Sequence, residues 1–413
     1  MTVQRPSLNE NRLPLRMVLW LTLLIAIFQG CACEKREKSE KPGIPPPALI
    51  GLAPKSYPVF QDDLDFDGLA HGLNQSLTYL NRLPADRVFQ FGNEEFTSRK
   101  IARGLTDFRD FIATQPSVPA LNQYIRDNLR VYRAAGTADD GKVLFTGYYE
   151  PLLEGRAVQD GIFQYPVYGL PQDLAVLDLT PFGKKFKGVK LTGRYTHPDF
   201  VPYHDRRAID LSGVLADKAP VLAWVKDPVD LFFLHIQGSG KIQIPSQEAL
   251  QVHYAAANGR PYRSIGRLLI DTGKIPREEM SMQRIRAYLA EHPEERDAIL
   301  YHNPSYVFFQ LEEDGPLGAI NVVLTPGRSL AVDRKLFPLA GLAYGRIQVP
   351  LVDGDGRIAK WMPVSRFVLP QDTGGAIKGA GRADLFWGNG DYAALAAGHM
   401  QHHGDLYFLA PAP

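Results

Sequence analysis

Cysteine is nearly absent from the 413-residue chain, since its two cysteines, Cys31 and Cys33, both lie close to the N-terminus. The rest of the chain can therefore form neither a disulfide nor a thiolate metal site. An excess of charge of one sign is lacking too, because 46 basic residues stand against 45 acidic ones. That balance excludes a nucleic-acid binder that relies on phosphate neutralisation. The expected ligand is neutral or weakly charged, and a polysaccharide fits.

The apolar run near the N-terminus, Met17–Phe28, is interrupted only by Thr22 and is too short to cross a membrane. As a helix it would extend about 18 Å, against the roughly 30 Å of a hydrocarbon core. Arginines precede the run, and Gln29, Gly30 and Cys31 follow it. This pattern is typical of a signal peptide, which we place at residues 1–30.

A small residue before Cys31, at the end of an apolar run, resembles the acylation site of bacterial lipoproteins. We expect lipidation at Cys31, with Cys33 as an alternative and ordinary cleavage with release as the other outcome. Residues 31–50 are rich in charge and proline and cannot bury apolar surface, so they should form an extended tether.

The folded body begins near Leu49, and its pattern of apolar residues changes after Gly141. Apolar residues at helical spacing predict helices over 64–83, 104–114 and 120–134, and again over 247–257 and 282–290. Short apolar runs broken by glycine, proline, asparagine and aspartate predict strands over 143–149, 221–225, 231–236 and 322–324, and from about 306 onward. These elements predict a β-rich α+β fold with barrel-like character.

The segment richest in possible chemistry lies near the C-terminus and contains Asp372, Gly374, Gly375 and Asp384. The glycines permit tight turns and close approach of a ligand to the backbone. Asp384 falls within the apolar run 383–387, where a carboxylate must line a cleft or be paired inside the fold. Partial desolvation would raise its pKa, as a general acid requires at neutral pH. The alternative is that both aspartates cap turns in a glycine-rich loop.

The same segment resembles the 3D domain, which is named for three aspartates. Asp333 follows Val332 before a Pro-Leu turn, Asp372 opens a Thr-Gly-Gly-Ala-Ile run, and Asp384 lies in the next predicted strand. Further blocks resemble the membrane-bound lytic murein transglycosylase A family over nearly the whole mature chain. These blocks are 145–151 (FTGYYEP), 232–240 (FFLHIQGSG), 258–262 (NGRPY), 303–306 (NPSY) and 324–329 (LTPGRS).

This resemblance implies a double-psi β-barrel built from two chain segments, 51–150 and 310–413, together with N-terminal helices. It implies a second β-barrel-like domain inserted at 151–309, with the substrate groove between the two. It also implies that Asp384 is the catalytic acid and that Asp372 and Asp333 are supporting carboxylates. We expect Asp372, when ionised, to raise the pKa of Asp384 by repulsion between like charges.

The activity implied by the resemblance is exolytic transglycosylation of peptidoglycan, at the β-1,4 bond between N-acetylmuramic acid and N-acetylglucosamine. The residues alone do not distinguish exolytic from internal cleavage. One carboxyl group suffices for this chemistry, because the muramic acid supplies its own 6-hydroxyl as nucleophile. A two-carboxylate glycan hydrolase remains an alternative, as does a lipoprotein that binds and anchors to peptidoglycan without cutting it.

The implied partners are peptidoglycan glycan strands and, through the N-terminal lipid, the periplasmic face of the outer membrane. Ala32 after Cys31 provides no inner-membrane retention aspartate. Cell-wall synthesis or division machinery is a further possible partner.

Several other side chains are candidates for substrate binding. His235 and Gln237 share a face of the predicted strand 231–236 and its end, where they could bind sugar hydroxyls or pack in the core. Tyr148 and Tyr149 could stack on sugar rings or pack inside. Gly374, Gly375 and Lys378 complete the expected substrate-binding set. We expect no metal and no cofactor, and we interpret the histidines at 399, 402 and 403 as a solvated face.

Overall fold

The computed structural model describes residues 47–137 and 140–412. The predicted signal peptide, both cysteines and all of the predicted tether before residue 47 lie outside the described residues. Within the described ranges, none of the helices is both long and apolar enough to span a bilayer.

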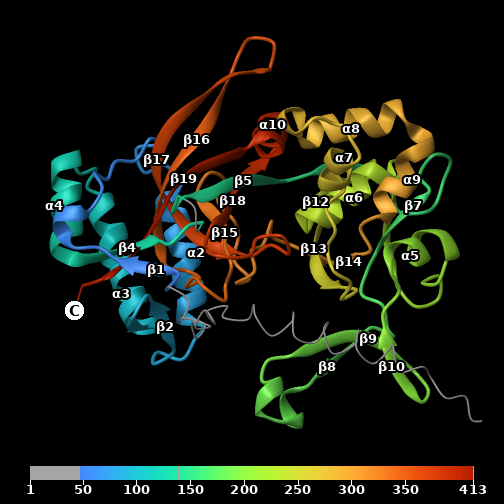
Figure 1. The fold of residues 1–413 in the computed structure, drawn as a ribbon, viewed down its shortest axis with the longest axis horizontal. Coiled ribbons are helices and arrows are strands. Elements are labelled where there is room, and N and C mark those ends of the chain that lie inside the picture. Colours follow the sequence, from blue (N-terminus) through green and yellow to red (C-terminus); the bar gives the residue numbers. More distant parts are fainter. Residues whose placement is uncertain (1–46, 138–139, 413) are drawn as a thin grey trace, which may run out of the picture. The chain divides into compact units, whose positions relative to one another are not determined.

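Six strands close into a barrel in which each strand is hydrogen-bonded to two others (Figure 1). The order around the barrel is β19-β16-β17-β15-β18-β5, and β5 pairs back onto β19. The pairs β5–β18 and β15–β17 are parallel, and the other pairs are antiparallel. The strands are β5 (Val143–Glu150), β15 (Ser329–Ala331), β16 (Leu342–Val352), β17 (Ile358–Asp372), β18 (Arg382–Asn389) and β19 (Gln401–Pro411).

One barrel strand precedes the inserted segment and five follow it, so two distant chain segments build this barrel, as predicted. Two more strands, β4 and β1, extend the sheet through β19, while β2 and β3 form a separate two-stranded sheet and helices pack beside the barrel. For example, Ile101, Leu105 and Phe108 recur at helical spacing on α3 and are buried in the core. The added elements are β1 (Leu49–Gly51), α2 (Leu69–Asn81), β2 (Val88–Phe91), β3 (Glu94–Thr97), α3 (Ser98–Ile112), α4 (Val118–Asn128), β4 (Leu129–Ala134) and α10 (Asp391–His399).

The chain between β5 and β15 forms a second six-stranded sheet in the order β14-β13-β12-β6-β11-β7. A bridge between Gly169 and Phe309 joins its two outer strands, which makes this sheet barrel-like. The strands are β6 (Leu152–Arg156), β7 (Tyr165–Tyr168), β11 (Val221–Val225), β12 (Ser239–Gln243), β13 (Leu250–Ala257) and β14 (Val307–Glu312).

Five helices and a separate three-stranded sheet belong to the same inserted segment (Figure 1). The helices are α5 (Arg206–Ser212), α6 (Pro228–Gln237), α7 (Ile265–Asp271), α8 (Met282–Glu291) and α9 (Pro293–Tyr301). The separate sheet consists of β8 (Ala175–Asp178), β9 (Lys190–Thr196) and β10 (Asp199–Pro202). The β-rich α+β class with two barrel-like parts is therefore confirmed.

Some predicted elements are wrong. The predicted strand 231–236 is part of helix α6, the predicted helix 247–257 contains strand β13, and the predicted helix 120–134 ends at Asn128, where β4 begins. The predicted strand 322–324 is an irregular segment with one isolated bridge at Val323.

The domain boundaries at residues 151 and 309 stay a prediction, although β5 and β6, on either side of Pro151, do belong to different sheets.

Candidate active site

The barrel brings Asp372 and Asp384 to the two sides of one short strand. Ala331 of β15 lies opposite Asp384 of β18 on one side and opposite Asp372 of β17 on the other. Asp333 follows two residues after Ala331. The three aspartates of the predicted signature therefore converge at one end of β15, because a parallel and an antiparallel partner flank this strand.

Asp384 is half-buried, and its Oδ1 accepts a hydrogen bond of 2.8 Å from Thr146 Oγ1 on β5. Burial raises the pKa of Asp384 to about 6, repulsion from Asp372 adds to the increase, and Thr146 and Arg382 oppose it. The expected repulsion thus acts in the predicted direction, but loss of hydration is the larger cause. Asp384 as a whole residue is neither fully buried nor fully exposed.

Asp372 is held by three donors. Tyr148 donates its hydroxyl to Oδ2 at 2.9 Å, while the backbone N–H groups of Ala319 and Thr373 donate to Oδ1. Burial nevertheless raises the pKa of Asp372 to about 6, because these hydrogen bonds only partly offset the loss of hydration. Asp372 and Asp384 therefore both have pKa values raised to about 6, and in both cases burial is the largest cause.

Asp333 differs from the other two aspartates because its environment favours the charged form. Burial raises its pKa, but hydrogen bonds from the backbone N–H groups of Gly379 and Lys335 and the positive charges of Lys378 and Lys335 outweigh that effect. The pKa of Asp333 therefore lies below its usual value. This carboxylate stays ionised and ties the loop after β17 to the end of β15.

The loop 373–381 carries the other residues of this segment that we predicted to bind substrate. Gly375 is exposed, with no atom within 4 Å of the position that a Cβ would occupy. Gly374 lies against Ile377, and the exposed Lys378 donates to the Gly374 carbonyl at 3.2 Å. These residues lie beside the carboxylates and border the site.

A cavity of about 700 Å³ lies next to the carboxylates, but neither Asp372 nor Asp384 lines it. Leu317 and Asn321 line it, and between them Ala319 donates to Asp372. Glu312, Glu313 and Asp314 form its acidic side. Neither Asp372 nor Asp384 lines this cavity, although the segment 317–323 forms part of its wall and holds Asp372 through the N–H of Ala319.

Tyr148 and Tyr149 are both buried, which leaves their rings little surface for stacking on a sugar. Tyr148 instead orients Asp372 through its hydroxyl. The backbone N–H of Tyr149 donates to Gln237 Oε1 at 3.2 Å, so Gln237 links α6 to β5. Gln237 is half-buried, and within residues 47–137 and 140–412 its amide nitrogen makes no hydrogen bond.

His235 lies inside the inserted segment with only 5% of its surface exposed. Arg206 Nη1 contacts its Nδ1 at 3.0 Å, and the rings of Tyr306 and Phe309 pack against it. Burial and the charge of Arg206 hold the pKa of His235 well below its usual value. We therefore leave His235 out of the proposed substrate site, because its position gives it a packing role.

Comparisons with known proteins identify the family of the chain. Residues 144–310 match the family model of the MltA specific insert domain, and residues 328–410 match that of the 3D domain. Membrane-bound lytic murein transglycosylase A of Escherichia coli K12 is 34% identical over 285 residues, which cover 68% of this chain and 69% of the relative. The chain belongs to the membrane-bound lytic murein transglycosylase A family. Membership makes it a peptidoglycan-cleaving lyase.

Other members of the family extend the comparison. The Vibrio cholerae relative is 32% identical over 286 residues, covering 68% of this chain and 69% of the relative. A crystal structure from Agrobacterium tumefaciens has a TM-score of 0.71 and 32% identity, and the match covers 88% of this chain and 98% of that one. The structure of E. coli MltA with bound chitohexaose has a TM-score of 0.69 and 27% identity, with coverages of 89% and 96%.

Two residues for which we predicted no role lie beside Asp384 in the structure. Thr146 donates to Asp384, and Arg382 Nη2 donates to Thr146 Oγ1 at 3.3 Å. Thr146 lies within the block FTGYYEP, and its register opposite Asp384 depends on the parallel pairing of β5 with β18. Sequence periodicity does not reveal which strands pair.

For the described residues, no group of three or more histidine, cysteine, aspartate or glutamate side chains is placed to hold a metal.

Proposed function

We propose that Asp384 is the single acid–base catalyst of a lytic transglycosylation at the β-1,4 bond between N-acetylmuramic acid and N-acetylglucosamine. The observation that carries this proposal is the half-buried Asp384, whose pKa is raised to about 6 in a closed barrel where Asp372 lies across the same short strand. At pH 7 about a tenth of such groups carry the proton that a general acid must donate, against about a thousandth for an ordinary aspartate.

In the first step, protonated Asp384 donates its proton to the glycosidic oxygen while the bond from that oxygen to C1 of the muramic acid breaks. The N-acetylglucosamine leaves with a 4-hydroxyl group, and C1 acquires oxocarbenium character. The carboxylate formed on Asp384 and the dipoles around it stabilise this positive charge. The ionised Asp333 adds negative potential to the same end of the barrel.

In the second step, the carboxylate of Asp384 removes the proton of the muramic 6-hydroxyl as O6 bonds to C1. The product carries a 1,6-anhydro ring, Asp384 is protonated again, and no water is consumed. Asp372 supports this cycle by favouring the protonated form of Asp384 through like-charge repulsion. Gly374, Gly375, Lys378 and the free amide of Gln237 are the proposed contacts to the glycan.

The replacement Asp384→Asn tests the catalytic assignment. We expect turnover of purified sacculi to fall by at least about a thousandfold, since the amide can neither donate nor accept the transferred proton, while sacculus binding is kept. Asp355→Asn, at an exposed turn, is the matched control and should leave turnover unchanged. Turnover of Asp384→Asn within tenfold of the wild type would remove Asp384 from this role. Lost binding with lost turnover would indicate a structural role instead.

A two-carboxylate hydrolase is the second candidate, because Asp372 also has a raised pKa of about 6 and could activate a water molecule. The two functions differ in their products, since hydrolysis leaves a reducing muramic acid. A binding lipoprotein without catalysis would release no fragments at all.

For the location of the enzyme, we propose acylation of Cys31 and residence at the periplasmic face of the outer membrane. The family name supports membrane association in general. Incorporation of labelled palmitate that is lost in Cys31→Ala, but kept in Cys33→Ala, would support this site. The opposite pattern would assign acylation to Cys33. Contacts with the cell-wall synthesis or division machinery stay a prediction.

A further inference from the structure

The separate sheet β8–β10 and its tip form a distinct feature, residues 175–202, which we call the lysine arm. Between β8 and β9 the tip consists of two short 3-10 helices, η2 (Thr180–Phe182) and η3 (Lys184–Phe186). The arm takes no part in either six-stranded sheet. It lies at the bottom of Figure 1.

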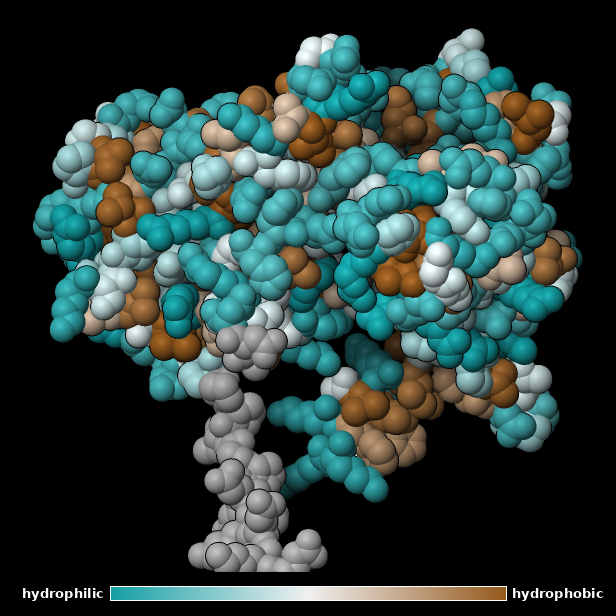
Figure 2. Space-filling model, turned by 45° about the horizontal axis from the view of Figure 1, so that its top comes forward, coloured by the Kyte–Doolittle hydropathy of each residue, from teal (hydrophilic) through white to brown (hydrophobic). Residues whose placement is uncertain are grey.

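Apolar side chains are unusually exposed on the arm. Phe182 and Tyr195 are each 68% exposed, and Leu191 and Val189 are 45% and 39% exposed. Val176, which is 57% exposed, lies on the opposite face of the sheet from Leu191, because it pairs with Thr192. Figure 2 shows brown side chains gathered on this part of the molecule, with teal side chains extending around them. A cluster of this kind marks a surface that binds a partner.

The charges near the tip of the arm are positive except for that of Asp178, which lies opposite Lys190 in the pairing of β8 with β9. Residues 179–195 contain five basic residues and no aspartate or glutamate. Among the described residues, no ion pair involves Lys184, Lys185, Lys187 or Lys190. The chain as a whole is almost neutral, so this local excess of positive charge is a property of the arm.

Hydrogen bonds and an ion pair hold the base and the tip of the lysine arm in place. At its base, Asp173 pairs with Lys218 at 3.2 Å and accepts a hydrogen bond from Tyr203. At the tip, Thr180 Oγ1 accepts from the backbone N–H of Gly188, and Asp178 accepts from the N–H of Thr180. The exposed Phe182 is therefore presented on a defined turn.

We propose that the lysine arm docks on an anionic phospholipid bilayer, with Phe182 and its apolar neighbours entering the interface and the lysines contacting the headgroups. Lysines around exposed aromatic and aliphatic side chains match the charge and the polarity gradient of such a surface. A glycan surface fits less well, because residues 179–195 contain no asparagine, glutamine, aspartate or glutamate with which to bind sugar hydroxyls. The contact would hold the enzyme at the membrane independently of any acyl chain.

Binding to vesicles tests the proposal in the full chain carrying Cys31→Ser and Cys33→Ser, which cannot be acylated at cysteine. We expect binding to phosphatidylglycerol vesicles to exceed binding to phosphatidylcholine vesicles and to decrease with salt. Lys184→Glu with Lys187→Glu should weaken phosphatidylglycerol binding at least tenfold, since each lysine near an anionic surface contributes roughly fivefold.

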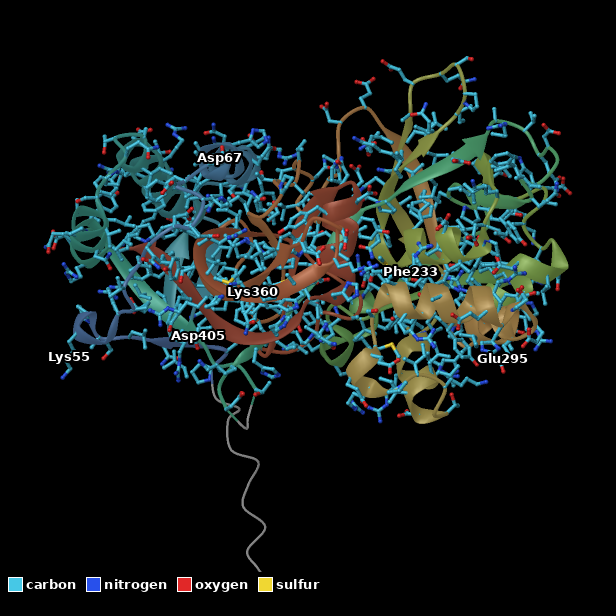
Figure 3. The ribbon with its side chains drawn as sticks, turned by 90° about the horizontal axis from the view of Figure 1, so that it is seen from above. Lys55, Asp67, Phe233, Glu295, Lys360 and Asp405 are labelled. Atoms are coloured by element: carbon cyan, nitrogen blue, oxygen red, sulfur yellow. The ribbon has the colours of Figure 1, made fainter. Side chains whose placement is uncertain are left out.

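Lys55→Glu with Lys360→Glu is the matched control. Both lysines are exposed, and Figure 3 labels them on the part of the chain outside the inserted segment. This pair makes the same change of net charge and should leave vesicle binding within twofold. Equal losses from the two pairs would show that only net charge matters and would overturn the proposal. Both variants should cleave soluble glycan strands at the wild-type rate, so failure of docking is distinguishable from failure of catalysis.

Insertion of the tip is tested separately, so that a misfolded charge variant cannot decide the outcome. The background without cysteine allows one fluorescent label at Phe182→Cys. We expect a blue shift of an environment-sensitive label with phosphatidylglycerol vesicles and none with isolated glycan strands. A shift with glycan strands alone would assign the arm to substrate, and no shift with either would leave it without a docking role; both results overturn the proposal.

Discussion

Burial is the main cause of the raised pKa of Asp384, and repulsion from Asp372 is a smaller one. From the sequence we could predict the three aspartates and their order, because these follow a recognisable pattern. The relative size of the two effects, however, depends on how closely other strands surround each carboxyl. The role of Tyr148 depends on the same packing, since its ring is buried and only its hydroxyl reaches Asp372.

The pH dependence of the reaction should report the pKa of Asp384. Only the protonated acid can start the reaction, so kcat/KM should fall as pH rises through about 6. Thr146→Val removes a hydrogen bond that favours the carboxylate, so the alkaline limb should move to higher pH. Thr146→Ser keeps the hydroxyl and should restore the wild-type profile. A profile that is unchanged in Thr146→Val would contradict a positioning role for Thr146.

Among the elements, α6 and β13 show where local pattern is insufficient. The run Leu231–Ile236 is continuously apolar, which fits a buried strand and a buried helix equally well. Asp227 caps α6 and Gly238 ends it in a left-handed conformation, and these were the signals for a helix. Residues 250–257 contain good helix formers, yet pairing with β12 and β14 on both sides makes them a strand.

The pairing of β5 with β18 is the element contact on which the site depends, because β5 carries both Thr146 and Tyr148. A Cβ at Gly147 would lie 2.6 Å from Trp387 Nε1 and 2.8 Å from the Cα of Ala397. Gly147→Ala should therefore lower the free energy of unfolding by about 1–3 kcal/mol and reduce turnover. Gly375→Ala, where a Cβ meets no atom within 4 Å, is the control for stability. Denaturant unfolding measures both; equal stabilities would show that β5 has room to move.

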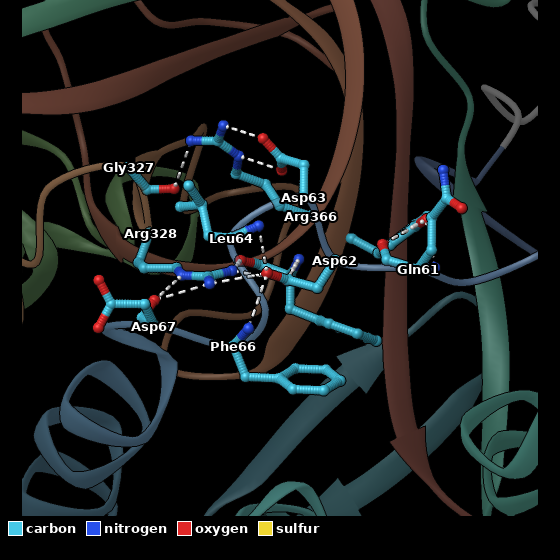
Figure 4. A network of polar contacts seen from close by, with 11 residues as sticks. Gln61, Asp62, Asp63, Leu64, Phe66, Asp67, Gly327, Arg328 and Arg366 are labelled. Atoms are coloured by element: carbon cyan, nitrogen blue, oxygen red, sulfur yellow. Dashed lines mark hydrogen bonds and ion pairs between the residues drawn. The ribbon is translucent and has the colours of Figure 1, made fainter. Parts of the chain in front are cut away.

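In the whole molecule, a buried ion pair joins the start of the folded body to the barrel (Figure 4). Both side chains of Arg328 and Asp62 are fully buried and make two hydrogen bonds, at 2.7 and 2.8 Å. Arg328 also donates to the carbonyls of Asp67 and Phe367. This network lies one residue from Ser329 at the start of β15, so it fixes the strand that leads to the carboxylates. The sequence shows Arg328 within a motif but not its distant partner.

Asp62→Ala should destabilise the protein by about 3–5 kcal/mol, because it leaves the guanidinium of Arg328 buried without its counter-charge. Asp86→Ala, at an exposed position, should change stability by less than about 0.5 kcal/mol. Thermal and denaturant unfolding would measure both. A cost for Asp62→Ala as small as that of the control would mean that water replaces the carboxylate.

In the proposed reaction the sugar supplies the nucleophile while Asp384 transfers one proton. Digestion of purified sacculi in ¹⁸O-labelled water, followed by mass spectrometry of the released muropeptides, tests it most directly. We expect 1,6-anhydro ends without label. Muramic acid with a reducing end and one ¹⁸O atom would contradict it, because water would then be the nucleophile.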